Sequence, residues 1–307
     1  MSRRIVLGSR GSKLALVQAE SVAARIREAS PGIDVTIARI VTGGDRNRDI
    51  QLDHTASVGV FVRELEEALL DCQVDLAAHS LKDMPTEIPS GLCLAAITER
   101  LDPRDVLVSR GEKLAELAHG AKIGTGSLRR AVQLVAWRPD LEVCGIRGNV
   151  DTRLRKMADG EFDGVILAAA GLKRLGWEDR ITEYLPTEYF LPAVGQGALA
   201  VETRSDDREV TEIIAPLNDL PAWQSITAER AFLRALGGGC RAPIAALGRI
   251  EGTRLILEGM VADVKEMKML RGREEGEPAA AEDIGVRLAQ RLLAMGAEEY
   301  VARAREG

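Results

Sequence analysis

Residues 122–137 have the sequence KIGTGSLRRAVQLVAW, and they decide the fold class. A short apolar segment leads through a polar turn into an amphipathic segment that extends to about Trp137. The same order recurs over residues 142–158 and again over residues 164–174. Such alternation of strand and helix predicts a mainly parallel sheet with helices on its faces. We therefore expect an α/β fold around these units.

The N-terminal residues have the same alternation, and they predict a second α/β domain. An apolar strand leads into the segment GSRGS and then an amphipathic helix, and further strand–helix units follow. The expected elements are strands over 4–7, 35–41 and 74–78 and helices over 13–28 and 61–70. A strand over residues 199–202 is expected to return to this domain. The polar segment 43–59 is long for a compact domain, and such loops are commonly lids.

After residue 216 the pattern changes, which indicates a third domain. The expected elements are a helix over 223–236, strands over 244–250, 255–261 and 268–271, and a closing helix over 284–295. Meandering strands enclosed by helices predict a small α+β domain.

Composition restricts the functional classes. The 307 residues carry a net charge of −6, which argues against a general nucleic-acid role. No apolar stretch is long enough for a membrane helix, and the N-terminus lacks a signal-peptide core, so we expect a cytoplasmic protein that does not bind membranes. The cysteines and histidines are scattered without metal-ligand spacing, so we expect metal-free chemistry.

Cations follow several predicted strands, where α/β sheets bind ligands. They are Arg10, Lys82, Arg129, Arg130, Arg147, Arg153, Lys173 and Arg174. Arg129 and Arg130 open a helix, where the macrodipole disfavours cations by about 0.3–1 kcal/mol each, so an anionic ligand is expected there. Arginine suits carboxylates because it binds them bidentately. Any single arginine could instead be a solvated or ion-paired surface residue.

Asp83 and Cys240 are the candidate reactive groups. Asp83 ends the segment HSLKD after a strand, where its carboxylate can stabilise a cation or transfer a proton; Ser80 and Asp83 could instead cap backbone amides. Cys240 follows three glycines and precedes Arg241, which favours the thiolate. Cys72, Cys93 and Cys144 lie in or beside apolar elements and are expected to be packing residues. The glycine-rich segments at Gly8 and Gly124 match neither the phosphate-loop nor the dinucleotide spacing, which disfavours a nucleotide-dependent transferase.

Taken together, these residues resemble the hydroxymethylbilane synthase family, also called porphobilinogen deaminases. The matching motifs are GSRGSKLALVQ from Gly8, FVRELEEALL from Phe61, HSLKDMP from His79, GTGSLRR from Gly124, RGNVDTRL from Arg147, AAGLKRLG from Ala169, LPAVGQGALA from Leu191 and GGGCRAPIAA from Gly237. They occur in the family's order along nearly the whole chain. One departure is Val58, where many bacterial members have lysine; Arg46 or Arg48 is a candidate substitute.

The resemblance implies a fold, a reaction and a set of site residues. The fold is two domains of the type II periplasmic-binding-protein kind joined by a double hinge, with a small α+β domain. The expected boundaries are 1–98 with 198–216, 102–193 and 219–307. The implied enzyme joins four porphobilinogens head to tail, with loss of ammonia, on a dipyrromethane cofactor held by Cys240 through a thioether. Asp83 is then catalytic. The residues implied to bind cofactor or substrate are Arg10, Ser12, Gln18, Ser80, Lys82, Thr125, Ser127, Arg129, Arg130, Arg147, Arg153 and Arg174. No interface pattern in the sequence argues against a monomer, so we expect a monomer.

The main alternative is a cytosolic sensor of an organic polycarboxylate, built like a periplasmic binding protein. It accounts for the arginines and for two domains. It has no use for a cysteine loop on a third domain.

Overall fold

The structure is a computed structural model that describes residues 4–40, 62–237 and 243–306. It consists of two compact units. Unit 1 comprises residues 1–100 and 198–223, and unit 2 comprises residues 101–197 and 224–307. The predicted lid over residues 43–59 and the predicted tether Cys240 lie outside the described residues.

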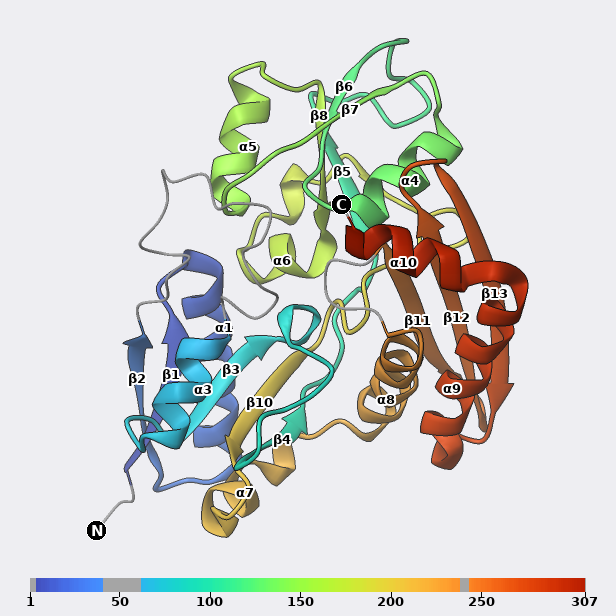
Figure 1. The fold of residues 1–307 in the computed structure, drawn as a ribbon. Coiled ribbons are helices and arrows are strands. Elements are labelled where there is room, and N and C mark those ends of the chain that lie inside the picture. Colours follow the sequence, from blue (N-terminus) through green and yellow to red (C-terminus); the bar gives the residue numbers. More distant parts are fainter. Residues whose placement is uncertain (1–3, 41–61, 238–242, 307) are drawn as a thin grey trace. The chain divides into compact units, whose positions relative to one another are not determined.

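Unit 1 is built on a sheet with the strand order β2-β1-β3-β10-β4 (Figure 1). β1 is parallel to both of its neighbours, whereas β10 is antiparallel to β3 and to β4. The strands are β1 (Arg4–Arg10), β2 (Asp34–Ile40), β3 (Leu76–Ser80), β4 (Leu92–Ile97) and β10 (Leu199–Arg204). The strand predicted over residues 199–202 therefore does return to the first sheet.

Alternation along the strands divides the core of unit 1 between the two faces of the sheet. Ile5 and Leu7 belong to a cluster with α1 (Lys13–Ala29) and α7 (Arg208–Ile214). Val6 packs into a second cluster, formed with α3 (Arg63–Leu70). A Cβ on Gly8 would lie 3.1 Å from a methyl carbon of Leu65, so the absence of a side chain lets α3 pack closely against β1.

Unit 2 contains a second mixed sheet, with the order β7-β6-β8-β5-β9. β6 is parallel to β7 and β8, and β5 runs antiparallel to β8. The strands are β5 (Asp105–Ser109), β6 (Lys122–Gly124), β7 (Glu142–Cys144), β8 (Gly164–Ala168) and β9 (Glu183–Tyr184). The helices are α4 (Leu128–Trp137), α5 (Val150–Ala158) and α6 (Ala169–Arg174).

Unit 2 also contains a three-stranded antiparallel sheet with its own core. The strands are β11 (Ile244–Glu251), β12 (Arg254–Asp263) and β13 (Lys268–Gly276). The helices are α8 (Leu220–Ala235), which belongs to unit 2 from Gln224 onward, α9 (Ala281–Leu292) and α10 (Glu298–Glu306). Phe232, Leu257 and Leu288 lie in the buried cluster between this sheet and its helices. Ala245 and Met260 pack in a further cluster with Val132 of α4.

The predicted fold class is confirmed. In both mixed sheets three parallel strands lie in the spatial order second, first, third along the chain. A strand antiparallel to them follows in the sheet, and one further strand completes it, which is the type II arrangement that the resemblance implies. Three details differ from the expectations: β4 and β9 were not predicted, and the closing helix continues past a turn at Gly296 into α10. The prediction that Cys72 is a packing residue is wrong, because Cys72 is exposed in the turn after α3, with φ +56°. Cys93 and Cys144 are partly buried.

Candidate functional site

The turn after β3 carries the reactive carboxylate predicted in unit 1. Residues Leu81–Asp83 form one turn of 3₁₀ helix. Leu81 within the turn and Met84 immediately after it are buried, whereas Asp83 is exposed. The buried pair fixes the turn to the core, so that the Asp83 carboxylate faces outward.

Ser80 does not cap the turn after β3. Its hydroxyl exchanges hydrogen bonds with the amide of Gln18 on α1, at 2.8 and 3.2 Å. Arg10 is the last residue of β1, and Ser12 caps α1 by accepting from Ala15 N at 3.2 Å. Because β1 and β3 are parallel neighbours, these side chains and Lys82 gather at one edge of the sheet of unit 1.

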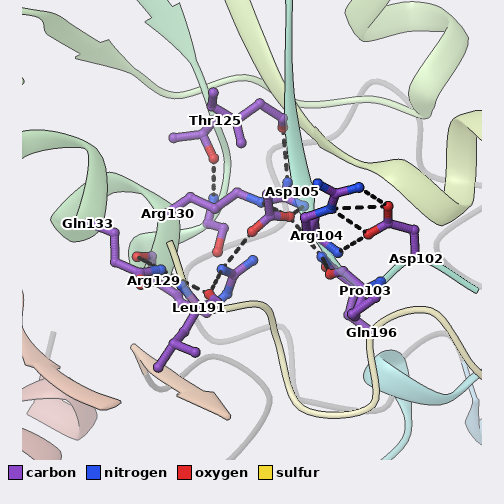
Figure 2. A network of polar contacts seen from close by, with 12 residues as sticks. Asp102, Pro103, Arg104, Asp105, Thr125, Arg129, Arg130, Gln133, Leu191 and Gln196 are labelled. Carbon is purple, nitrogen blue, oxygen red and sulfur yellow. Dashed lines mark hydrogen bonds and ion pairs between the residues drawn. The ribbon is translucent and has the colours of Figure 1, made fainter. Parts of the chain in front are cut away.

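In unit 2, Arg129 and Arg130 are almost completely buried, and both bind the carboxylate of Asp105. Arg129 Nη1 lies 2.7 Å from Asp105 Oδ2, and Arg130 Nη2 lies 2.6 Å from Oδ1. Figure 2 shows the two guanidinium groups converging on this carboxylate from α4. Both also donate to backbone carbonyls, Arg129 to Leu191 and Arg130 to Ile166. Burial alone would raise the pKa of Asp105, but the two arginine charges hold it well below its usual range.

The protein itself thus supplies an anion at the start of α4. The position of two cations in a first helical turn predicted an anionic ligand, but the structure offsets them with Asp105 instead. One carboxylate cannot neutralise two guanidinium groups, so the Arg129–Arg130–Asp105 cluster keeps one positive charge. The carboxylate-binding role of the two arginines stays a prediction.

Two glutamines extend this network (Figure 2). Gln196 donates to Asp105 Oδ1 at 2.9 Å and to the carbonyl of Pro103 at 2.7 Å. Gln133 accepts from Leu191 N at 2.7 Å. None of Asp105, Gln133 and Gln196 was predicted as a site residue. The sequence contains one indication of the role of Asp105: it begins the apolar strand sequence DVLV, where an unpaired acid would be costly, so a buried partner could have been predicted.

The remaining predicted residues of unit 2 follow β6, β7 and β8. Arg147 is exposed and forms no ion pair with any residue that the structure describes. Arg153 Nε donates to the carbonyl of Gly148, and Arg174 Nη2 donates to that of Gly197, at 2.8 and 2.7 Å.

A short turn leads from β6 into α4. The hydroxyl of Thr125 accepts from Ser127 N at 3.2 Å, which shapes this turn. A Cβ on Gly126 would lie 2.8 Å from the carbonyl oxygen of Ile146, so the turn approaches the chain just before Arg147 closely.

The structure therefore assembles the predicted residues into two groups. The group in unit 1 is Arg10, Ser12, Gln18, Ser80, Lys82 and Asp83, and the group in unit 2 is Thr125, Ser127, Arg129, Arg130, Arg147, Arg153 and Arg174. Cys240 and Val58, together with Arg46 and Arg48, lie outside the described residues.

Sheet topology and cation placement define a class: an α/β protein with two type II mixed sheets and cations at its strand ends. Two family models match this chain. "Porphobilinogen deaminase, dipyromethane cofactor binding domain" covers residues 5–212, and "Porphobilinogen deaminase, C-terminal domain" covers residues 223–294. The chain belongs to the porphobilinogen deaminase family.

Curated relatives match over nearly their full length. The porphobilinogen deaminase of Syntrophus aciditrophicus is 47% identical over 98% of this chain and 99% of its own. That of Syntrophomonas wolfei is 46% identical over 99% and 100%, and that of Roseiflexus castenholzii 48% over 98% and 100%. Among solved structures, the methionine binding protein MetQ aligns with a TM-score of 0.45 and 15% identity, over 81% of this chain and 99% of its own.

Proposed function

We propose that this protein condenses four porphobilinogen molecules head to tail, releasing ammonia, to give the linear tetrapyrrole hydroxymethylbilane. The observation that carries the proposal is the family match, which extends over both family domains and nearly the whole chain. The polycarboxylate sensor is not favoured, since the curated relatives at this similarity are named as the deaminase.

The residues present fit a dipyrromethane cofactor. Each pyrrole ring of such a group carries an acetate and a propionate, so its site needs several cations able to bind carboxylates. In unit 2, Arg147 is exposed, Arg153 is half-buried, and the Arg129–Arg130–Asp105 cluster keeps one positive charge. We propose that Arg147 and Arg153 bind the cofactor and substrate carboxylates, that the remaining positive charge of the Arg129–Arg130–Asp105 cluster attracts these carboxylates, and that Cys240 is the point of thioether attachment. When bound, the cofactor supplies the free pyrrole carbon on which the first porphobilinogen is added.

We assign the chemical step to the turn after β3. Loss of ammonia from porphobilinogen breaks its aminomethyl C–N bond and leaves a methylenepyrrolenine cation. The cation forms a C–C bond at a free pyrrole carbon, which then loses its proton. The exposed Asp83 carboxylate is suited to accept a hydrogen bond from the pyrrole N–H and to stabilise the cation. Lys82 and Arg10, at the same sheet edge, are suited to bind the substrate carboxylates.

The same proposal includes the domain boundaries, the cellular location and the oligomeric state of the enzyme. The two mixed sheets and the antiparallel sheet support domains over residues 1–98 with 198–216, 102–193 and 219–307. We take the enzyme to be a cytoplasmic monomer. Among the described residues, no helix has the length and apolar character needed to cross a membrane.

Intact-mass measurement tests this function. Wild-type protein from a host that makes porphobilinogen is expected to carry one dipyrromethane unit, which maps to the peptide containing Cys240. Asp83→Ala is expected to keep the adduct, or a short elongation product, and to lose turnover by about 100- to 10,000-fold, the range for a proton-transfer or charge-stabilising group.

Cys240→Ser serves as the control and should carry no adduct. An unmodified wild-type protein that still turns over would disprove covalent attachment. Near-normal turnover of Asp83→Ala would remove Asp83 from the mechanism.

A further inference from the structure

A buried group of titratable side chains lies in unit 1 behind the turn that carries Asp83. His79 is on β3, Glu202 is on β10 and Glu66 is on α3. Their exposed fractions are 5%, 0% and 9%. Charged side chains are almost never buried to this extent unless they are paired. The proposed chemistry uses none of the three.

The contact at the centre of this group joins His79 to Glu202. His79 Nε2 lies 3.0 Å from Glu202 Oε2. Ala77 faces Glu202 and His79 faces Ala200 in the antiparallel ladder, so both titratable side chains project from the same face of the sheet. Among the residues that the structure describes, His79 is the basic side chain that lies within ion-pair distance of the Glu202 carboxylate.

The third member, Glu66, is coupled electrostatically to the other two. Burial raises the pKa of Glu66, and the nearby Glu202 raises it further, while His79 opposes the shift. Burial and Glu202 also raise the pKa of the Cys93 thiol on β4. Electrostatic interactions therefore connect Glu66 and Cys93 to the pair formed by His79 and Glu202.

The position of the pair suggests its use. His79 is the penultimate residue of β3, and Ser80 completes the strand immediately before the turn Leu81–Asp83. Successive strand residues point to opposite faces, so β3 is held on both sides at its end: Ser80 by Gln18 on one face, His79 by Glu202 on the other. The turn itself is attached to the residue immediately before β10, because Leu81 N donates to the carbonyl of Ala198 at 3.2 Å.

Stability alone is a weak reason for such a pair. Replacing both partners of a buried ion pair by apolar residues is often neutral or stabilising, because the desolvation cost disappears as well. What a polar pair adds is a preferred position: the 3.0 Å contact between His79 Nε2 and Glu202 Oε2 is within ion-pair distance, although it lacks hydrogen-bond geometry, whereas apolar packing tolerates small shifts.

We propose that His79 and Glu202 are positioning residues that fix the end of β3, and thereby orient the turn that presents Asp83. This inference rests on the proposed function for its link to turnover, but not for its link to the geometry of the turn. Neither side chain touches substrate; both act through the backbone of residues 80–83.

The test replaces the pair by apolar residues of similar size, His79→Leu with Glu202→Met. We expect a folded protein whose melting temperature is not lowered. Turnover by the cofactor-loaded enzyme should fall about 10- to 100-fold, as small misplacements of catalytic groups do, while KM for porphobilinogen changes less than about twofold. Hydrogen exchange at the amides of Leu81 and Met84 should accelerate at least about tenfold. Leu81 N donates to the carbonyl of Ala198 and Met84 N to that of Leu81, and both hydrogen bonds depend on the position of the end of β3.

Thr203→Val is the matched control. Thr203 is equally buried and is the next residue on β10, but it faces the far end of β3, where its hydroxyl donates to the carbonyl of Asp75 at 2.8 Å. We expect it to leave turnover and exchange in the turn unchanged. Glu202→Gln keeps the shape and replaces the carboxylate by an amide, and it gives the same comparison if the double variant does not fold.

A folded variant with wild-type turnover and wild-type exchange at Leu81 and Met84 would overturn the proposal. A raised KM with unchanged turnover would overturn it as well. Assaying Asp83→Asn in parallel separates the two ideas: if Asp83→Asn keeps turnover, the assignment of the chemical step fails, while the exchange measurement still decides whether the pair positions the turn.

Discussion

Two regions of the molecule place charges where strands end, and they treat those charges in opposite ways. In unit 1, Asp83 is exposed on a turn that is anchored by the buried side chains of Leu81 and Met84. In unit 2, Arg129 and Arg130 are buried and bound to Asp105, which is itself fully buried. Position after a strand therefore does not by itself assign a side chain to a ligand. Burial and the partner distinguish a group that is available for chemistry from one that holds the framework around it.

The largest effect expected from this contrast follows from Asp105→Asn. The variant leaves two buried guanidinium groups without their carboxylate, and breaking a buried pair in this way costs about 3–5 kcal/mol. Denaturant unfolding at neutral pH measures the loss. Glu178→Gln is the control, because Glu178 pairs with Lys173 at 3.8 Å in a half-exposed position, where such pairs contribute about 0–1 kcal/mol.

The pH dependence sharpens the same prediction. Because its neighbours depress the pKa of Asp105 in the folded state, the stabilisation is fully present above the unfolded carboxyl pKa, which is about 4. It is lost as pH falls through the depressed folded value. The stability difference between wild type and Asp105→Asn should therefore shrink below about pH 4. A difference under about 1 kcal/mol at neutral pH would mean that the arginines do not depend on Asp105, and that a ligand is needed to offset them.

Much of the fold is predictable because periodicity is a local signal. The units around residues 122–137 and the existence of strand β10 follow from strand and helix patterns within a few residues. Strand β4 was not predicted because its sequence, LCLAAI, is a continuous apolar run that shows neither the alternation of a strand nor the period of a helix. β9 consists of only two residues, Glu183 and Tyr184, which is too short for any period.

The site is predictable only in part, and the reason is again distance along the chain. Arg129 can be seen in the sequence to follow a strand, but its burial depends on Asp105, 24 residues earlier, and on the Leu191 carbonyl, 62 residues later. The pair formed by His79 and Glu202 likewise requires β3 and β10 to be neighbours. Single residues within motifs are visible in a sequence, whereas their partners appear only when the sheet order is known.

A smaller effect is expected at Arg147, the exposed member of the arginine set. Arg147→Gln should lower kcat/KM for porphobilinogen about tenfold, which corresponds to about 1.4 kcal/mol and to one lost charged hydrogen bond. The unfolding free energy should stay within about 0.5 kcal/mol of wild type, because the side chain is exposed. Steady-state kinetics and denaturant unfolding measure the two quantities.

Arg155→Gln provides the comparison for Arg147. Arg155 is also exposed, on α5, and is not one of the predicted ligand-binding residues. Equal kinetic effects of the two variants would indicate a general contribution of surface charge rather than a specific contact. A loss of stability in Arg147→Gln would show that exposure fails to separate ligand groups from framework groups.

The smallest effect tests a residue that fits neither category cleanly. Ser80 is a predicted ligand-binding residue, yet its hydroxyl is already engaged by Gln18, which is 4% exposed. Ser80→Ala should lower the unfolding free energy by about 1 kcal/mol, since a buried amide loses a partner. A double-mutant cycle with Gln18→Leu should give a coupling energy of about 0.5–1.5 kcal/mol.

The value of that coupling decides where Ser80 belongs. A measurable coupling together with wild-type KM would assign Ser80 to the framework, on the same footing as His79 on the opposite face of β3. No coupling together with a raised KM would assign its hydroxyl to the ligand, and the Ser80–Gln18 contact would then be one that substrate binding replaces. In the first case both faces of β3 are fixed before substrate arrives, and the exposed Asp83 carboxylate is oriented by the fold alone.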